Sequence, residues 1–273
     1  MSFDSLFAAF AAIINALFVI VGIYVYVSLV RQISSRPALE TSPRTARHFG
    51  LPDAIAAAVL TGWFLLNVAA SFSIAHDLTK TRTRDLVAQG LFTIGLLLFL
   101  AAFLRLRGFN LTSLGGLAKL SFGRVLSTGT ILLFAAYPLI YLADALTRRL
   151  LGAGLNRQEI IELFNSSQTL PQRIIIIVMA VAVAPIAEEF IFRFFLYGVF
   201  KRYFGRLIGV SLNAFLFAAV HTHLPSFAPL FVLGSCFTIA YEWSGSILVS
   251  MTMHSLFNSL TLTLLAFPQT LPQ

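Results

Sequence analysis

The sequence predicts an all-α membrane protein that crosses the bilayer with about eight transmembrane helices. Its 273 residues are 58% apolar and 11% charged, and the mean hydropathy is +0.86. Soluble domains carry roughly 25% charged and about 45–50% apolar residues. A soluble core of this size cannot bury such an apolar fraction, because much of any folded surface faces water. The composition excludes a soluble enzyme, a disordered chain and, since Cys236 is the single cysteine, a disulfide scaffold.

The charged residues are distributed as in a multi-span membrane protein. The formal net charge is +8 and the pI is about 10.1. Lys and Arg are concentrated in short segments between long apolar runs and do not follow one face. This pattern is typical of loops near lipid headgroups. We therefore expect the lipid bilayer as a partner and exclude nucleic acid.

Residues 1–146 are predicted to form a membrane region of four spans, to which no motif assigns a role. A spanning helix needs roughly 20 mostly apolar residues. The runs of this kind are Phe7–Val30, Ala54–Ala75, Leu86–Leu104 and Val125–Leu146. Asp4 is the one charged residue before the first run, whereas a signal peptide begins with positive charge. We therefore expect the first run to be a retained helix.

Residues 147–173 are predicted to be a polar connecting segment, with an amphipathic helix around Gln158–Phe164 lying at the membrane interface. Residues 174–273 then hold the remaining spans. These are Ile174–Phe200, Leu207–Val220, Leu224–Tyr241 and Gly245–Phe267.

The basic residues of the loops predict the orientation of the chain. The first, third and fifth loops carry eleven Lys and Arg residues, and the second and fourth carry seven. Cytoplasmic loops are enriched in Lys and Arg, so the N-terminus is expected outside. The sequence has no organelle-targeting signal and no long soluble domain. We therefore expect a multi-pass protein of the plasma membrane.

Three charged residues interrupt the apolar run Ile174–Phe200, namely Glu188, Glu189 and Arg193. A charge in the middle of a membrane helix is unfavourable by at least about 2.5–3.5 kcal/mol, so such groups face a cavity and have partners. Arg193 follows Glu189 by four residues and shares its helix face. The two glutamates point about 100° apart. This spacing predicts a Glu189–Arg193 pair that leaves Glu188 free, the alternative being one buried ion cluster without chemistry. Pro185 precedes Glu188, where a bend and freed carbonyls are expected to widen a cavity.

The following spans carry complementary polar residues. His221 lies four residues after Phe217, and His254 and Asn258 share a helix face at the same spacing. Histidine accepts or donates a proton near neutral pH, and asparagine offers a neutral amide donor. A carboxylate base, a neutral histidine and a His/Asn face are the parts required for water activation and an oxyanion hole.

These residues form three ordered motifs: EExxxR at Glu188–Arg193, FxxxH at Phe217–His221 and HxxxN at His254–Asn258. Together they resemble the CAAX-processing and bacteriocin-processing (CPBP, or ABI) intramembrane endopeptidases, over about residues 174–267. The resemblance implies a glutamate-dependent intramembrane protease acting on a peptide or protein substrate, prenylated or membrane-embedded. In the family pattern Glu188 and His221 hold and activate the attacking water. Glu189 and Arg193 orient the site, and His254 and Asn258 stabilise the oxyanion.

Two further questions concern His223 and a metal ion. His223 lies outside the motifs and is expected in a loop. We expect no cofactor, because a carboxylate-activated water needs no metal and the chain lacks HExxH. Zinc is the alternative, since two histidines and a glutamate are a plausible ligand set.

Two other functions remain open on the sequence alone. Intramembrane Glu and His residues also serve transporters and proton relays. Such proteins usually have internal repeats with broken helices in both halves, whereas here every candidate polar group lies in the C-terminal half. The other alternative is a binding or immunity protein that keeps the motifs without catalysis.

Overall fold

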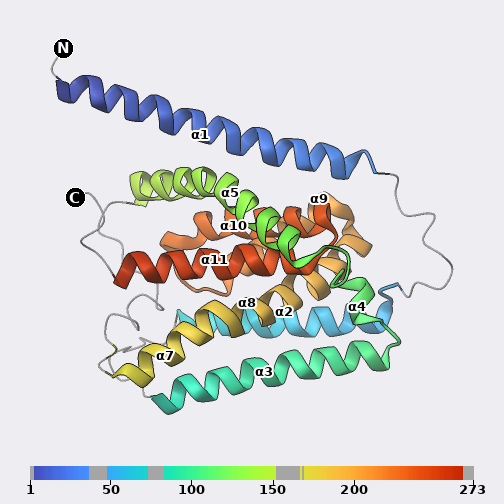
Figure 1. Ribbon diagram of the computed structural model, residues 1–273. Coiled ribbons are helices and arrows are strands. Elements are labelled where there is room, and N and C mark those ends of the chain that lie inside the picture. The colour runs from blue at the N-terminus through green and yellow to red at the C-terminus, as the bar shows by residue number, and fades with distance from the viewer. Residues whose placement is uncertain (1–2, 37–47, 73–82, 152–166, 168, 267–273) are drawn as a thin grey trace.

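The computed structural model describes residues 3–36, 48–72, 83–151, 167 and 169–266. Every regular element within these ranges is a helix, which confirms the all-α class (Figure 1). The interfacial helix expected around Gln158–Phe164 lies outside the described residues.

The N-terminal region contains a long helix at each predicted span. Its elements are α1 (Phe3–Ser34), α2 (Leu51–Ser71), α3 (Thr83–Leu106), the short α4 (Leu111–Leu114) and α5 (Phe122–Leu151). Figure 1 shows α1 along one edge of the bundle and α3 along the opposite edge. Leu, Ile, Val and Phe side chains cover the exposed faces of α1, α2 and α3. Such faces are expected where lipid is the solvent.

The C-terminal region alternates between α-helical and π-helical segments. Its elements are α7 (Leu170–Val178), the π-helix η2 (Met179–Val183), α8 (Ala184–Glu188), the π-helix η3 (Glu189–Leu196), α9 (Tyr197–Ala219), the 3₁₀-helix η4 (Leu224–Ser226), α10 (Phe227–Ser244) and α11 (Ile247–Ala266). π-helical turns are rare and occur frequently at functional sites. No sequence pattern predicted them here.

Within the described residues, seven helical stretches are long and apolar enough to span a membrane, and the longest is Leu170–Ala219 with 50 residues. Gly205 inside it has φ 81° and ψ 171°, a conformation that favours glycine and that no helix contains. A Cβ on Gly209 would lie 3.0 Å from the backbone nitrogen of Lys201. The chain therefore reverses at Gly205, and this stretch contains the fifth and sixth predicted spans back to back.

An ionic cluster joins the ends of α1, α9 and α10. The Glu242 carboxylate accepts a hydrogen bond from Lys201 Nζ at 2.8 Å and lies 3.3 Å from Arg206 Nε. Arg206 Nη1 also donates to the carbonyl of Ile33 at 2.9 Å, and Arg36 Nη1 donates to that of Glu242 at 3.2 Å. The first and fifth loops therefore lie at one end of the bundle, as the predicted topology requires. Which side of the membrane this end faces stays a prediction.

A second polar contact ties α2 to the end of α3. Asp53 is fully buried and accepts hydrogen bonds from the backbone N–H of Gly50 at 2.7 Å and from Arg107 Nε at 3.2 Å. The hydrogen bond with Asp53 raises the pKa of Arg107. Asp53 thus caps the start of α2 and holds the following helix.

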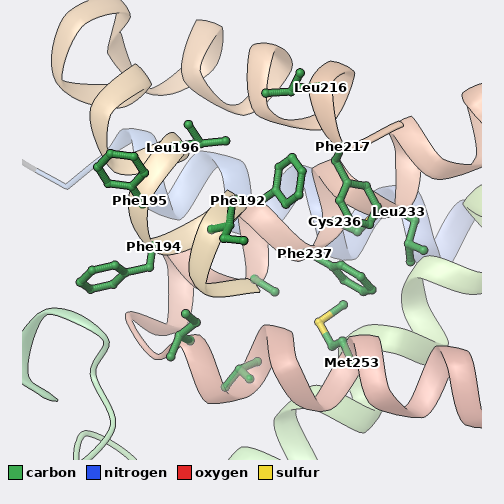
Figure 2. Packing of buried hydrophobic residues seen from close by; sticks show 14 of the residues in the cluster. Phe192, Phe194, Phe195, Leu196, Leu216, Phe217, Leu233, Cys236, Phe237 and Met253 are labelled. Atoms are coloured by element: carbon green, nitrogen blue, oxygen red, sulfur yellow. The ribbon is translucent and has the colours of Figure 1, made fainter. Parts of the chain in front are cut away.

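Aromatic side chains fill the centre of the C-terminal region. Figure 2 shows Phe192, Phe217 and Phe237 gathered between η3, α9 and α10, with Met253 approaching from α11. The Phe192 and Phe217 rings meet edge to face, with centroids 5.5 Å apart. All four side chains are buried. Arg193 of the EExxxR motif lies against this aromatic core.

Candidate active site

The two adjacent glutamates lie in different environments. Glu188 is the last residue of α8 and Glu189 the first of η3. The side chain of Glu188 is 27% exposed, whereas that of Glu189 is completely buried. The two side chains therefore point into different surroundings, as expected for helix neighbours about 100° apart.

Glu189 forms the predicted pair with Arg193. Arg193 Nη1 lies 3.0 Å from Glu189 Oε1, and neither side chain is exposed. The guanidinium carbon also lies 4.2 Å from the ring centroid of Phe217 and 5.2 Å from that of Phe237. A buried charge needs a partner, and aromatic faces attract a guanidinium further. The pair is thus enclosed by protein and has no access to solvent.

His254 on α11 connects the two glutamates. Its Nδ1 donates a hydrogen bond to Glu189 Oε1 at 2.9 Å, because an ionised carboxylate can only accept. Its Nε2 lies 3.9 Å from Glu188 Oε2. The buried ion pair therefore sets the orientation of the imidazole and leaves Nε2 beside Glu188.

His221 is oriented by its own helix. Its Nδ1 donates to the carbonyl of Phe217 at 2.7 Å, one turn earlier near the end of α9. A carbonyl only accepts, so the proton is on Nδ1 and the lone pair is on Nε2. This tautomer can accept a hydrogen bond or a proton from a ligand.

Phe217 is a site residue whose role the sequence analysis missed. Its ring lies 4.8 Å from that of His221 and 5.9 Å from that of His254, centroid to centroid. A Cβ on Gly234 of α10 would come within 2.9 Å of Phe217 Cδ1, so this helix approaches closely. The phenylalanine of FxxxH was the available signal. Its ring packs against both histidines and against Arg193.

Asn258 lies one turn after His254 and already makes one strong contact. Its Nδ2 donates to the carbonyl of Ala180 in η2 at 2.7 Å. The sequence predicted an amide facing the site but not this backbone partner. An amide group has two N–H bonds, so one remains for a ligand.

A cavity of about 340 Å³ brings the candidate residues together. Glu188, His221, His254 and Asn258 all line it, while Glu189 and Arg193 do not. Leu86 and Gln89 of α3 form part of its wall. The N-terminal region, which carries no motif, thus contributes to the site.

The part of the chain that holds the cavity residues Glu188, His221, His254 and Asn258 is similar to a known protein family. Residues 170–260 match the family described as Type II CAAX prenyl endopeptidase Rce1-like. This match, which covers a third of the chain, supports the CAAX-protease (CPBP) family. All six predicted site residues lie within the matched range. The chain has no significant match among curated proteins or among solved structures.

The family match and the spanning helices agree on the class of protein. The chain is a multi-pass membrane protein with a CAAX-protease-like core, which supports an intramembrane endopeptidase at the level of the family. The match leaves residues 1–169 outside, although α3 of that region reaches the cavity of the protease core.

His223 lies away from the cavity of the CAAX-protease core. It precedes η4 in the segment that connects α9 to α10, as expected, and its Nδ1 lies 2.7 Å from Ser226 Oγ. It is not among the residues that line the cavity. The FxxxH spacing thus distinguishes His221 from its neighbour.

The cavity contains donor atoms of the kinds that bind a metal ion. The donors of suitable chemistry are Nε2 of His221, Nε2 of His254 and the Glu188 carboxylate. Among the described residues, no three His, Cys, Asp or Glu side chains are grouped so that they could hold a metal ion. These described side chains therefore form no ready metal site, and zinc stays the alternative to be tested by experiment.

Proposed function

We propose that the chain is an intramembrane glutamic endopeptidase in which Glu188 is the general base. The observation that carries the proposal is the contrast between the two glutamates. Glu189 Oε1 pairs with Arg193 and accepts a hydrogen bond from His254, while Glu188 lines the cavity. Among the described residues Oε2 of each glutamate is buried without a hydrogen-bond partner, but of the two residues only Glu188 lines the cavity. A carboxylate in this position can accept a proton from a bound water.

In the proposed reaction Glu188 takes a proton from water, and the water oxygen bonds to the carbonyl carbon of the scissile peptide. The electron pair of the C=O bond moves to oxygen. His221 Nε2 accepts the second hydrogen of the water as a hydrogen bond and orients the attack. Glu188 then gives its proton to the amide nitrogen, the oxyanion collapses and the C–N bond breaks. The products are an amine and a carboxylic acid, which releases its remaining proton to solvent as the carboxylate.

His254 and Asn258 are proposed to stabilise the oxyanion. Because Nδ1 of His254 donates to Glu189, its Nε2 can donate only when the ring is an imidazolium. The two glutamate carboxylates are then balanced by the Arg193 guanidinium and the His254 imidazolium. The second N–H of the Asn258 amide supplies a neutral donor.

The Glu189–Arg193 pair acts through His254 and not on the substrate. It is buried outside the cavity and holds the imidazole at 2.9 Å. Such a partner fixes the tautomer and ring orientation of a catalytic histidine. We therefore treat Glu189 and Arg193 as positioning residues.

The substrate is proposed to be a peptide or protein that enters from the plasma membrane. Leu86, Ile175, Ile176, Met179 and Leu262 line the cavity beside the polar residues. This lining suits an apolar side chain or a prenyl group.

A cleavage assay tests the proposed function. The full chain in lipid nanodiscs is given quenched fluorescent peptides with and without a C-terminal farnesyl cysteine, and products are identified by mass. Cleavage at a defined bond supports an endopeptidase. Proton flux into liposomes without cleavage would favour a proton relay, and neither activity would favour a binding or immunity protein. Activity that is lost with chelator and restored by zinc would contradict the expected absence of a metal.

A further inference from the structure

The carbonyl that binds Asn258 lacks a partner within its own helix. Ala184 donates its backbone N–H to Met179, five residues earlier, which is the register of a π-helix. In this register the donor for the Ala180 carbonyl would be residue 185. Pro185 has no N–H. The Ala180 carbonyl is therefore open to a side chain, and Asn258 Nδ2 donates to it at 2.7 Å.

We infer that Pro185 is a positioning residue that reserves the Ala180 carbonyl for Asn258. Its catalytic consequence rests on the proposed function, in which Asn258 is an oxyanion donor. The inference explains why a proline is buried in a π-to-α junction that lines the site. Because Pro185 has no N–H, the Ala180 carbonyl stays available to Asn258.

The orientation of the amide is the property that this contact controls. The terminal torsion of asparagine is broad and roughly two-fold, so the side chain can present oxygen or nitrogen to the cavity. A carbonyl accepts only, and it therefore selects the amide nitrogen. Both N–H bonds belong to that nitrogen. Holding one on Ala180 keeps the other near the cavity that His254 also lines, whereas a flipped amide would repel an oxyanion.

The test replaces Pro185 with alanine, which restores the N–H without adding bulk. The new donor competes with Asn258 for the Ala180 carbonyl. We expect kcat to fall by about three- to tenfold, the effect of one neutral hydrogen bond, with KM unchanged. Alanine favours a helix more than proline does, so the variant should remain folded. Pro185→Ser restores the same N–H and serves as a second variant.

Pro138→Ala is the matched control. Pro138 also lies inside a spanning helix, α5, but it does not line the cavity. It should leave kcat unchanged. An equal loss in both variants would show a general effect of proline on the bundle and would overturn the inference.

A double-mutant cycle separates an effect through Asn258 from one through Glu188, which lies three residues after Pro185. In an Asn258→Ala background, Pro185→Ala should cause no further loss of kcat. Losses that multiply would show that Pro185 acts independently of Asn258, which contradicts the inference.

The side-chain amide of Asn258 gives a readout that does not depend on catalysis. In protein labelled with ¹⁵N-asparagine, its signal is assigned by its absence from Asn258→Ala. We expect Pro185→Ala to shift this signal and to accelerate its hydrogen exchange, while Pro138→Ala leaves both unchanged. An unaltered signal in Pro185→Ala would overturn the inference. This readout holds even if the wild-type chain cleaves no peptide, an outcome that would contradict the proposed function alone.

Discussion

The guanidinium of Arg193 lies over the ring of Phe217, with Cζ 4.2 Å from the ring centroid. The same ring packs against His221 and His254, and its backbone carbonyl holds His221. One residue thus connects the buried ion pair to both histidines. The EExxxR and FxxxH motifs meet at this contact.

Phe217→Leu should therefore impair both catalysis and stability. Leucine keeps much of the volume but loses the aromatic face, which lowers the free energy of unfolding by about 1–2 kcal/mol. The histidines lose their fixed separation, and kcat should fall by about tenfold or more. Phe194→Leu is the control, since Phe194 is buried and stacks on Phe190. Thermal unfolding and peptide cleavage are measured on the same samples, and equal kcat values in the two variants would refute this role.

Arg193→Met should destabilise the protein strongly. It leaves the Glu189 carboxylate buried without its charged partner, which typically lowers stability by about 3–5 kcal/mol. The double variant Arg193→Met with Glu189→Gln removes both charges and should recover part of that loss. Chemical denaturation in detergent of the wild type, both single variants and the double variant measures the coupling. If the double variant is no more stable than Arg193→Met, the pair is not the cause.

His221→Ala should remove activity, whereas His223→Ala should be mild. His221 lines the cavity with Nε2 available, and His223 lies outside it. The two residues are two positions apart and of one chemical type, so each is a control for the other. Initial rates of peptide cleavage are measured for both variants. Similar losses in the two would contradict the role assigned to His221.

Asn258→Ala should lower kcat by about 10²–10³-fold with little change in KM, the usual loss for one oxyanion donor. It also removes the hydrogen bond to Ala180, so the free energy of unfolding should fall by about 0.6–2 kcal/mol. Both quantities are measured on one preparation. A normal kcat together with reduced stability would make Asn258 a structural residue only.

The sequence was sufficient for the features that depend on charge and spacing in a lipid environment. An apolar run cannot hold Glu188, Glu189 and Arg193 without partners, and the four-residue spacing predicted which two would pair. The spans followed from length and hydropathy, and the fifth and sixth follow each other directly, separated by the reversal at Gly205.

Other features depend on contacts between distant segments, which local patterns do not contain. Pro185 predicted freed carbonyls, but the π-helical register of η2, which makes Ala180 the carbonyl that is freed, cannot be read from the sequence. The same holds for the α3 wall of the cavity, because Leu86 and Gln89 belong to an ordinary apolar run. The FxxxH motif included Phe217, but its contacts with Arg193 and His254 form only when distant segments pack together.

The identity of the general base is the centre of this account, and Glu188→Gln tests it most directly. Glutamine keeps the shape of the side chain but cannot take a proton from water. The control is Asp144→Asn, which changes a carboxylate paired with Arg148 on α5, outside the cavity. The measurement is kcat for peptide cleavage by folded protein in nanodiscs. We predict a loss of at least about 10²-fold for Glu188→Gln and a normal rate for Asp144→Asn. A Glu188→Gln rate above about a tenth of wild type would contradict the role of Glu188, since general bases contribute about 10²–10⁴-fold.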